Sequence, residues 1–216
     1  MKCPRCVQRI HRAAASCPHC GFSIVDADAR FGPPPARLRG LTDKAGILRH
    51  GDRERVEAAM QRIARRLPQL FAAIYTGTLG EAAHLRQFGF WLLNRAKFED
   101  QPAGEANAAG ILITLDPESK TAGMVFGYLL DPFLEESDTF DCLSRAHAYW
   151  LEGRYADGFV KALSHLETVL CKRSRQAHRH PRHFQQKVES HVRTDERDHR
   201  ILRRHPEAAE ITEGPR

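Results

Sequence analysis

The feature that most constrains the fold is a set of four cysteines within the first twenty residues. They form two Cys-X-X-Cys pairs, Cys3 with Cys6 and Cys17 with Cys20, which ten residues separate. A tight turn inside each pair directs both sulfurs toward one centre, and two such pairs supply the four thiolates of a tetrahedral structural zinc site. The spacing therefore predicts a zinc ribbon over residues 1–23, with Zn²⁺ bound by all four cysteines.

Two other uses of paired cysteines fit this sequence less well. Disulfides form in oxidising compartments, and the charged segment after Met1 lacks the apolar run of a signal peptide. A thioredoxin-type redox motif needs a strand-helix-strand setting, for which residues 1–22 are too short. We therefore expect a cytoplasmic protein with reduced cysteines. Cys142 and Cys171 lie in helical patterns and are expected to be partly buried thiols.

Positive charge is concentrated at the two ends of the chain. The net charge is +6 over 216 residues, of which residues 1–22 carry +4 and residues 172–216 carry +5. Clustered cations attract polyanions without regard to sequence, so we expect weak contact with nucleic acid or another polyanion through these ends. Residues 172–216 are rich in His and Arg and predict a basic tail that is partly disordered. No run of residues is long and apolar enough to predict a transmembrane segment.

A proline-rich stretch separates the cysteines from the rest of the sequence. Residues 24–40 include Pro33, Pro34 and Pro35, which lack amide donors and favour an extended path. We expect this stretch to be a linker. Residues 41–171 then form a segment long enough to bury a core of its own.

Residues 41–171 alternate between strand-like and helix-like patterns. Continuous apolar runs of the kind found in buried strands are joined by segments with apolar residues at helical spacing. Two strands joined by a helix are expected to be parallel, and a short turn after the second predicts an antiparallel return. The expected fold class is α/β, with a small mixed sheet and helices on both faces. The predicted strands are 70–75, 109–115 and 124–128, and the predicted helices are 56–67, 81–98, 139–152 and 155–171.

Four motifs in this segment resemble those of TPM domains, small α/β domains of a thylakoid-lumen protein and many bacterial proteins. Residues 41–48 (LTDKAGIL) are similar to V-x-D-x-A-G-x-L, and residues 107–113 (NAAGILI) are similar to D-N-G-V-L-L-L. Residues 126–131 (FGYLLD) are similar to V-G-Y-G-L-E, and residues 145–158 are similar to the F-R-x-G-x-Y-x-x-G helix pair. The resemblance covers residues 41–171 and implies a TPM-like fold.

The resemblance also implies two chemistries, acid-phosphatase activity and binding of a hard cation such as Ca²⁺ or Mg²⁺. Both need several carboxylates or other oxygen ligands at one edge of the sheet. Here Ala108 and Ala109 stand where the family has Asp-Asn, and an apolar residue near Val125 replaces a glutamate. The sequence therefore resembles the family more closely in fold than in these acids.

The remaining polar residues predict two candidate ligand sites at opposite edges of the sheet. Asp43 and Asp116 are expected near the carboxyl ends of the parallel strands, the edge where ligands bind in open α/β sheets. Asn107 and Asp131 are expected at the other edge, close to Glu136. The alternative is structural, because aspartates also cap helices and build turns before proline.

Two functions follow from this sequence. The first is a non-catalytic binding or adaptor module whose zinc ribbon docks a protein partner. The second, which the resemblance implies, is a metal-assisted hydrolase of the acid-phosphatase type. The missing family acids favour the first.

Overall fold

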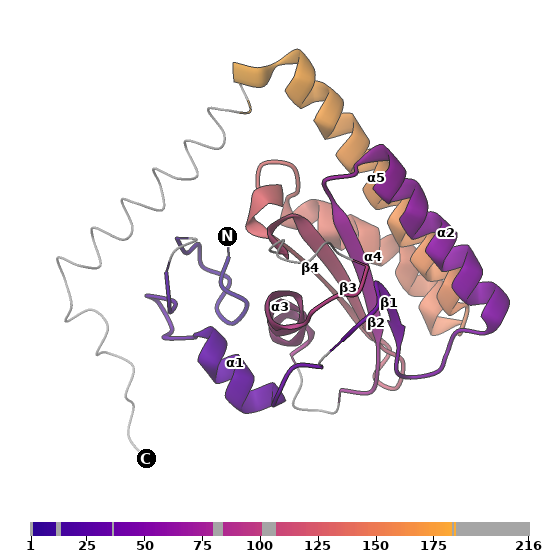
Figure 1. The fold of residues 1–216 in the computed structure, drawn as a ribbon, viewed down its shortest axis with the longest axis horizontal. Coiled ribbons are helices and arrows are strands. Elements are labelled where there is room, and N and C mark those ends of the chain that lie inside the picture. The colour runs from indigo at the N-terminus through magenta and orange to yellow at the C-terminus, as the bar shows by residue number, and fades with distance from the viewer. Residues whose placement is uncertain are drawn as a thin grey trace.

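The structure is a computed structural model that describes residues 2–11, 14–35, 37–79, 84–100, 107–182 and 184. A twisted sheet lies at its centre, with helices on either side and the cysteine-bearing segment beyond α3 (Figure 1). The elements in chain order are α1 (Ile24–Phe31), β1 (Leu41–Asp43), α2 (His50–Arg66), β2 (Phe71–Thr76), α3 (Leu85–Arg95), η1 (Asn107–Ala109), β3 (Gly110–Asp116), β4 (Thr121–Phe126), η2 (Tyr128–Leu130), α4 (Glu136–Leu151) and α5 (Tyr155–Arg179).

The four strands form one mixed sheet in the order β1-β2-β3-β4. β1, β2 and β3 are parallel, with Ile74 opposite Ile113, and β4 returns antiparallel with Met124 opposite Ile113. Every residue of β3 is buried, because this strand has neighbours at both edges and side chains packed on both faces. The predicted mixed sheet is confirmed, including the parallel pair and the antiparallel return.

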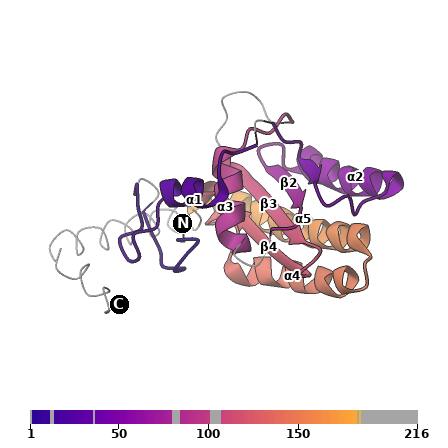
Figure 2. The same cartoon turned by 90° about the horizontal axis from the view of Figure 1, so that it is seen from below.

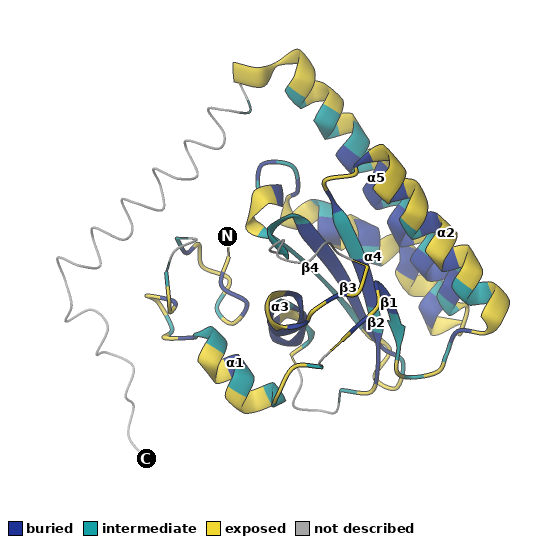
Figure 3. Cartoon of the chain, in the orientation of Figure 1, coloured by how far each residue is buried: buried dark blue, intermediate teal, exposed yellow. Residues whose placement is uncertain are grey.

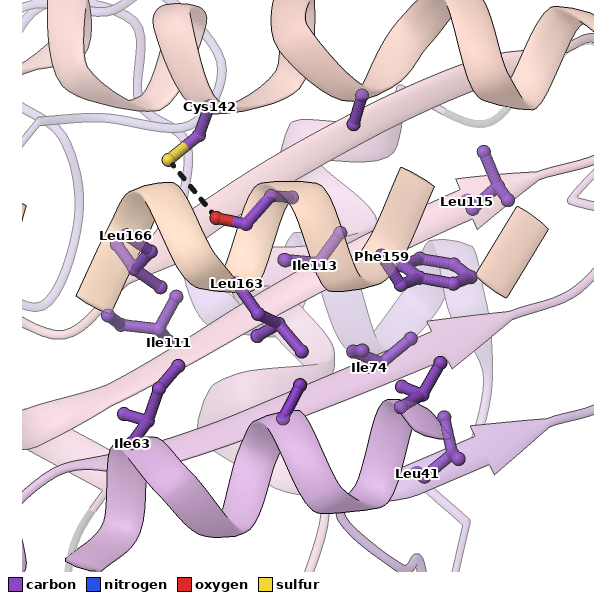
Figure 4. Close-up of a cluster of buried hydrophobic side chains, with 14 of the residues drawn as sticks. Leu41, Ile63, Ile74, Ile111, Ile113, Leu115, Cys142, Phe159, Leu163 and Leu166 are labelled. Atoms are coloured by element: carbon purple, nitrogen blue, oxygen red, sulfur yellow. Dashed lines mark hydrogen bonds between the residues drawn. The ribbon is translucent and has the colours of Figure 1, made fainter. Parts of the chain in front are cut away.

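Helices cover both faces of the sheet, as predicted (Figure 2). On one face, α2, α4 and α5 bury an aliphatic core that includes Ile111, Ile113 and Leu163 from the strands and α5 (Figure 4). On the other face, α3 packs against Ala73 and Leu112. The helices are buried where they meet the sheet and exposed on their outer sides, most clearly in α2 and α5 (Figure 3).

The glycines between α4 and α5 have steric roles. Gly153 ends α4 in the left-handed region with φ 77°, which other residues rarely adopt. Trp150 is buried against Phe159, with ring centroids 5.4 Å apart, and its Nε1 donates to the Tyr155 carbonyl at 3.3 Å. A Cβ at Gly158 would lie 2.2 Å from that Nε1, so only glycine lets the two helices approach this closely.

Three parts of the chain differ from the sequence-based expectations. Residues 24–31 of the expected linker form α1, because Ser23 and Asp26 make a capping box at its first turn. Residues 172–179 of the expected tail continue α5, and most later residues lie outside the described part of the chain. β1 was not expected, since three residues carry too little pattern to reveal a strand. Among the described residues, no helix is both long and apolar enough to cross a membrane.

Candidate metal centre and adjoining cleft

The four cysteines come together in one cluster. The backbone N–H of Cys3 donates to the Gln8 carbonyl and that of Cys17 donates to the Phe22 carbonyl, both at 2.8 Å, so each pair sits in a small hairpin. The two hairpins face each other, with 3.7 Å between the Sγ atoms of Cys3 and Cys20 and 3.6 Å between those of Cys6 and Cys17. All four Sγ atoms lie within 4.8 Å of one another.

These distances fit a tetrahedral thiolate site. Four sulfurs at about 2.3 Å from a Zn²⁺ ion are about 3.8 Å apart from one another. A disulfide would instead hold two sulfurs at about 2.05 Å. The Arg5 backbone N–H points at the Cys3 sulfur at 3.4 Å, the kind of contact that stabilises a metal-bound thiolate. The cluster can therefore hold one metal ion that prefers soft ligands.

The acidity of the thiols also favours a bound metal ion. Burial raises the pKa of Cys3 to about 12, and burial also raises the pKa of Cys20. Burial works to raise the pKa of Cys6 too, but hydrogen bonds from Gln8 and from the neighbouring cysteines leave it lowered. Four thiols this close cannot all ionise alone, and a divalent cation at their centre removes that penalty.

The two hairpins differ at the residue after their second cysteine. Gly21 has φ 72° and Val7 has φ 65°, so both positions use the left-handed region. Glycine adopts this conformation without cost, whereas a β-branched residue is strained there. The sharp turn at Val7 is therefore held by its surroundings, which include the cluster itself.

The cysteine module, residues 2–23, is packed onto the part of the chain that holds the sheet, through α1 and α3. Phe22 lies edge-on to Phe90 with centroids 6.1 Å apart, and Phe31 contacts Phe88 and Trp91, each at 5.4 Å. These aromatic contacts belong to the second hydrophobic core, on the α3 face of the sheet. Asp28 of α1 accepts hydrogen bonds from Trp91 Nε1 at 3.0 Å and from Arg95. Together these contacts fix the module against α3.

The structure places Asp43 at the carboxyl end of β1 with both oxygens occupied. Its Oδ1 accepts from the Ile47 N–H and the Thr76 hydroxyl, and its Oδ2 accepts from the Leu48 N–H and from Arg53. The Asp43 side chain has no solvent exposure. Burial alone would raise its pKa, but the Thr76 hydroxyl, the two N–H groups and Arg53 together lower it. This carboxylate organises the loop that follows β1.

Asp116, the other acid predicted at this edge, ends β3. Its Oδ2 accepts from the Leu79 N–H at 3.2 Å, and its Oδ1 accepts from the N–H groups of Glu118 and Ser119 at 2.9 and 3.3 Å. The residue is buried. These contacts are those of a turn-building aspartate, so each carboxylate oxygen of Asp43 and Asp116 already accepts a hydrogen bond from the described part of the chain.

The second predicted pair, Asn107 and Asp131, lies at the opposite end of the strands, before β3 and after β4. Asn107 sits in η1, where its Nδ2 donates to the Leu93 carbonyl and its Oδ1 is buried with no hydrogen-bond partner among the described residues. Asp131 follows η2, which packs against η1. Both residues line one cavity, so the structure brings this pair to a common space.

That cavity, of about 820 Å³, is bordered by the cysteine module, α3, β4 and the start of α4. Its lining is mixed, with about as many polar and charged residues as apolar ones. At the mouth, Lys2 Nζ lies 2.5 Å from Glu136 Oε2, and Arg86 reaches Glu136 Oε1 at 3.8 Å. The apolar lining residues include Phe90, Leu93, Met124, Val125, Phe126 and Leu134.

Sequence reasoning missed this cavity, which we call the cleft. It depends on where the cysteine module docks, and sequence gives no direct signal of that contact. One indirect signal of a binding surface was available: β4 (TAGMVF) contains no charge and no proline, although it is an edge strand of the sheet.

Comparison with known proteins identifies the larger part of the chain. Residues 41–169 match the model of the TPM domain. No curated protein matches the chain.

The solved structures that are similar to this chain include three bacterial proteins. The N-terminal domain of a P. gingivalis protein is 22% identical with a TM-score of 0.48, over 61% of this chain and 82% of that one. The N-terminal domain of a Corynebacterium glutamicum protein is 12% identical with a TM-score of 0.48, over 63% and 83%. A Bizionia argentinensis protein, BA42, is also 12% identical with a TM-score of 0.48, over 58% and 82%.

Proposed function

The chain belongs to the TPM domain family, and on that premise we propose that it is a non-catalytic binding module. In this proposal the cysteine module carries a structural Zn²⁺ and, with the TPM domain, forms one docking surface for a partner protein. The metal has no open coordination position, because four thiolates close its tetrahedron. Zinc in this role holds a shape and performs no chemistry on a substrate.

The observation that carries the proposal is the position of the cleft. Its walls come from the cysteine module on one side and from α3, β4 and α4 on the other. A cavity of about 820 Å³ whose lining combines apolar side chains with charged and polar ones has the character of a binding site. Since both parts of the chain contribute residues, neither part alone offers this surface.

The occupied carboxylates support the same proposal. Hydrolysis assisted by a hard cation needs oxygen ligands for the metal and a further acid or base. Asp43 and Asp116 already accept hydrogen bonds at every carboxylate oxygen. A cation bound there would compete with the contacts that build two loops.

Affinity capture tests the proposal. The tagged full-length protein is incubated with a lysate of its source cells, and captured proteins are compared with those held by the Cys17→Ser variant. Cys171→Ser is the matched control, because Cys171 lies on α5 outside the cluster. We expect a partner that wild type and the control capture and that Cys17→Ser loses. Capture of nothing specific by wild type would contradict the proposal.

A hydrolase remains the second candidate because of one observation: the Oδ1 of Asn107 is buried with no hydrogen-bond partner among the described residues, and Asp131 lines the same cavity. An oxygen in this state is a ready ligand for Ca²⁺ or Mg²⁺. The test is hydrolysis of a generic phosphomonoester from about pH 5 to 8, where carboxylates and histidines with shifted pKa values titrate. We expect no turnover with either cation. Activity that Asp131→Asn abolishes and that Asp116→Asn, at the opposite end of the strands, leaves intact would establish the hydrolase instead.

A further inference from the structure

We propose that the outer edge of β4 receives an extended, acidic segment of a partner protein as a fifth strand of the sheet. The proposal rests on the proposed function, because it names the class of partner segment and the way in which the cleft holds it. Main-chain hydrogen bonds would supply affinity, and pockets for alternate side chains would supply selectivity.

The two edges of the sheet are treated very differently. β1 has only three residues, and a very short edge strand resists further pairing. β4 has six residues, none of them charged and none proline. Among the described residues β4 pairs with β3 alone, and five of its six residues are half-buried while β3 is buried throughout. Within the described ranges, the outer edge of β4 is therefore unpaired.

The alternation of hydrogen-bonded pairs along β3 and β4 shows which backbone N–H and C=O groups of β4 point away from β3. The Gly127 N–H donates to the Gly110 carbonyl at 2.8 Å, which continues the β3–β4 ladder by one residue. Hydrogen-bonded pairs alternate along an antiparallel ladder, so Val125 and Gly123 also face β3. The backbone groups of Ala122, Met124 and Phe126 then point away from β3. These alternate residues are the ones an added strand would pair with.

The cleft supplies walls on both sides of that edge. Phe90 and Leu93 of α3 border it on one face of the sheet, and Leu134 and Thr139, before and within α4, border it on the other. Met124, Val125 and Phe126 form its base. A strand laid along β4 would direct its side chains alternately toward these two apolar walls.

Charge at the mouth selects the partner's chemistry. Glu136 is the shared carboxylate of two cations, Lys2 from the cysteine module and Arg86 from α3. Its side chain and that of Arg86 are each 49% exposed, and exposed ion pairs are weak and easily exchanged. An acidic residue beside the incoming strand can pair with Lys2 or Arg86, the two cations that contact Glu136. The cysteine module thus contributes a cation to partner selection.

Hydrogen exchange followed by NMR tests the proposal on the full-length zinc-loaded protein. The probe is a short blocked peptide that alternates valine with glutamate, and its lysine counterpart is the control. We expect the amides of Met124 and Phe126 to exchange rapidly in the free protein and slowly with the acidic peptide. The Val125 amide, already bonded to β3, should change little. Equal protection by both peptides, or none by either, would overturn the proposal.

Two variants separate the backbone contact from the charge contact. Met124→Pro removes an outward N–H that the β3–β4 ladder does not use, and Met124→Leu is its matched control. We expect the proline to weaken peptide binding by about tenfold or more and the leucine to leave it unchanged. Lys2→Glu with Arg86→Glu should weaken binding by about tenfold and abolish its dependence on salt. If neither the Lys2→Glu/Arg86→Glu double variant nor Met124→Pro changed the affinity for the peptide, strand addition would be refuted.

Other occupants give different results and would also overturn the proposal. A dimer in sedimentation that Met124→Pro makes monomeric would assign the edge to a second copy of the chain. Protection of Met124 and Phe126 in the free monomer, lost when residues 185–216 are removed, would assign it to the chain's own C-terminal residues. The proposed function is judged separately: a partner captured equally by wild type and Met124→Pro preserves the binding module and eliminates strand addition.

Discussion

The cysteine module and the TPM domain are stabilised by different means. The module buries few apolar side chains, among them Ile10 and Phe22, and its centre is a cluster of four thiols. The TPM domain buries aliphatic and aromatic side chains on both faces of a sheet, with Trp150 and Phe159 among the largest. We therefore expect the first to depend on a bound metal ion for its fold and the second to depend on its core.

The difference teaches where each part is vulnerable. Metal removal should unfold the module and leave the sheet intact, whereas a cavity in the core should weaken the sheet and leave metal binding intact. The aromatic contacts of Phe22 and Phe31 with α3 connect the two parts, so a change in one part reaches the other through them.

The largest expected effect is loss of the metal site in Cys17→Ser. Wild-type protein should carry about one zinc per chain, and this variant should carry almost none, because structural Zn²⁺ contributes about 10–16 kcal/mol of folding free energy in small modules. Metal analysis of the purified protein measures this directly. Cys171→Ser should keep its zinc. Full zinc in Cys17→Ser would show that Cys17 is not a ligand.

The core gives the next largest effect, through Trp150→Ala. Trp150 is 1% exposed and contacts Phe159, so its truncation should lower the free energy of unfolding of the TPM domain by about 3–5 kcal/mol. Urea unfolding followed by circular dichroism measures the change, and zinc content measured alongside should stay at the wild-type level. A parallel loss of zinc would mean that the two parts fold as one cooperative unit.

Asp43→Asn should have a smaller effect that depends on pH. The pKa of Asp43 is lowered in the folded protein, so its contribution is present above the ordinary value of 3.8 and is lost as the pH falls through the folded value. At pH 7 the variant should be less stable by about 1–3 kcal/mol, and the difference should narrow below about pH 4. Urea titrations at several pH values check this. A constant difference at every pH would exclude the ionised carboxylate as its source.

The smallest expected effect is a gain, in Val7→Gly. Glycine relieves the left-handed strain at φ 65°, so the module should bind zinc more tightly by an amount of about 1 kcal/mol. Competition with a chelator measures the shift. Gly21→Ala is the opposite change at the equivalent position of the other hairpin and should weaken zinc binding. Equal behaviour of the two variants would show that backbone strain does not matter here.

The strands and helices of the TPM domain were predictable because long, apolar segments leave a strong pattern. β3 is buried on both faces and appears in the sequence as an unbroken run, GILITL. β1 was not predictable, because its pairing with β2 depends on tertiary contacts and not on its three residues. α1 was hidden by the neighbouring prolines, although Ser23 and Asp26 carry its capping signal.

The candidate site divides in the same way. Cysteine spacing specifies a cluster because two short hairpins fix it locally, and the structure brings all four Sγ atoms together. The roles of Asp43 and Asp116 could not be predicted from the sequence, because an aspartate at a strand end gives the same sequence pattern whether it binds an ion or closes a turn. The cleft required knowledge of how the module docks, a contact between residues far apart in the chain.

The carboxylate of Asp28 gives the molecule a mechanical property. Because it ties α1 to Trp91 and Arg95 of α3, tension applied to the cysteine module passes into α3, which packs on the central strand β3. The prolines after α1 therefore do not act as a slack tether between the module and the domain. A pull on the cysteine module would therefore be transmitted to the TPM domain through α1 and α3.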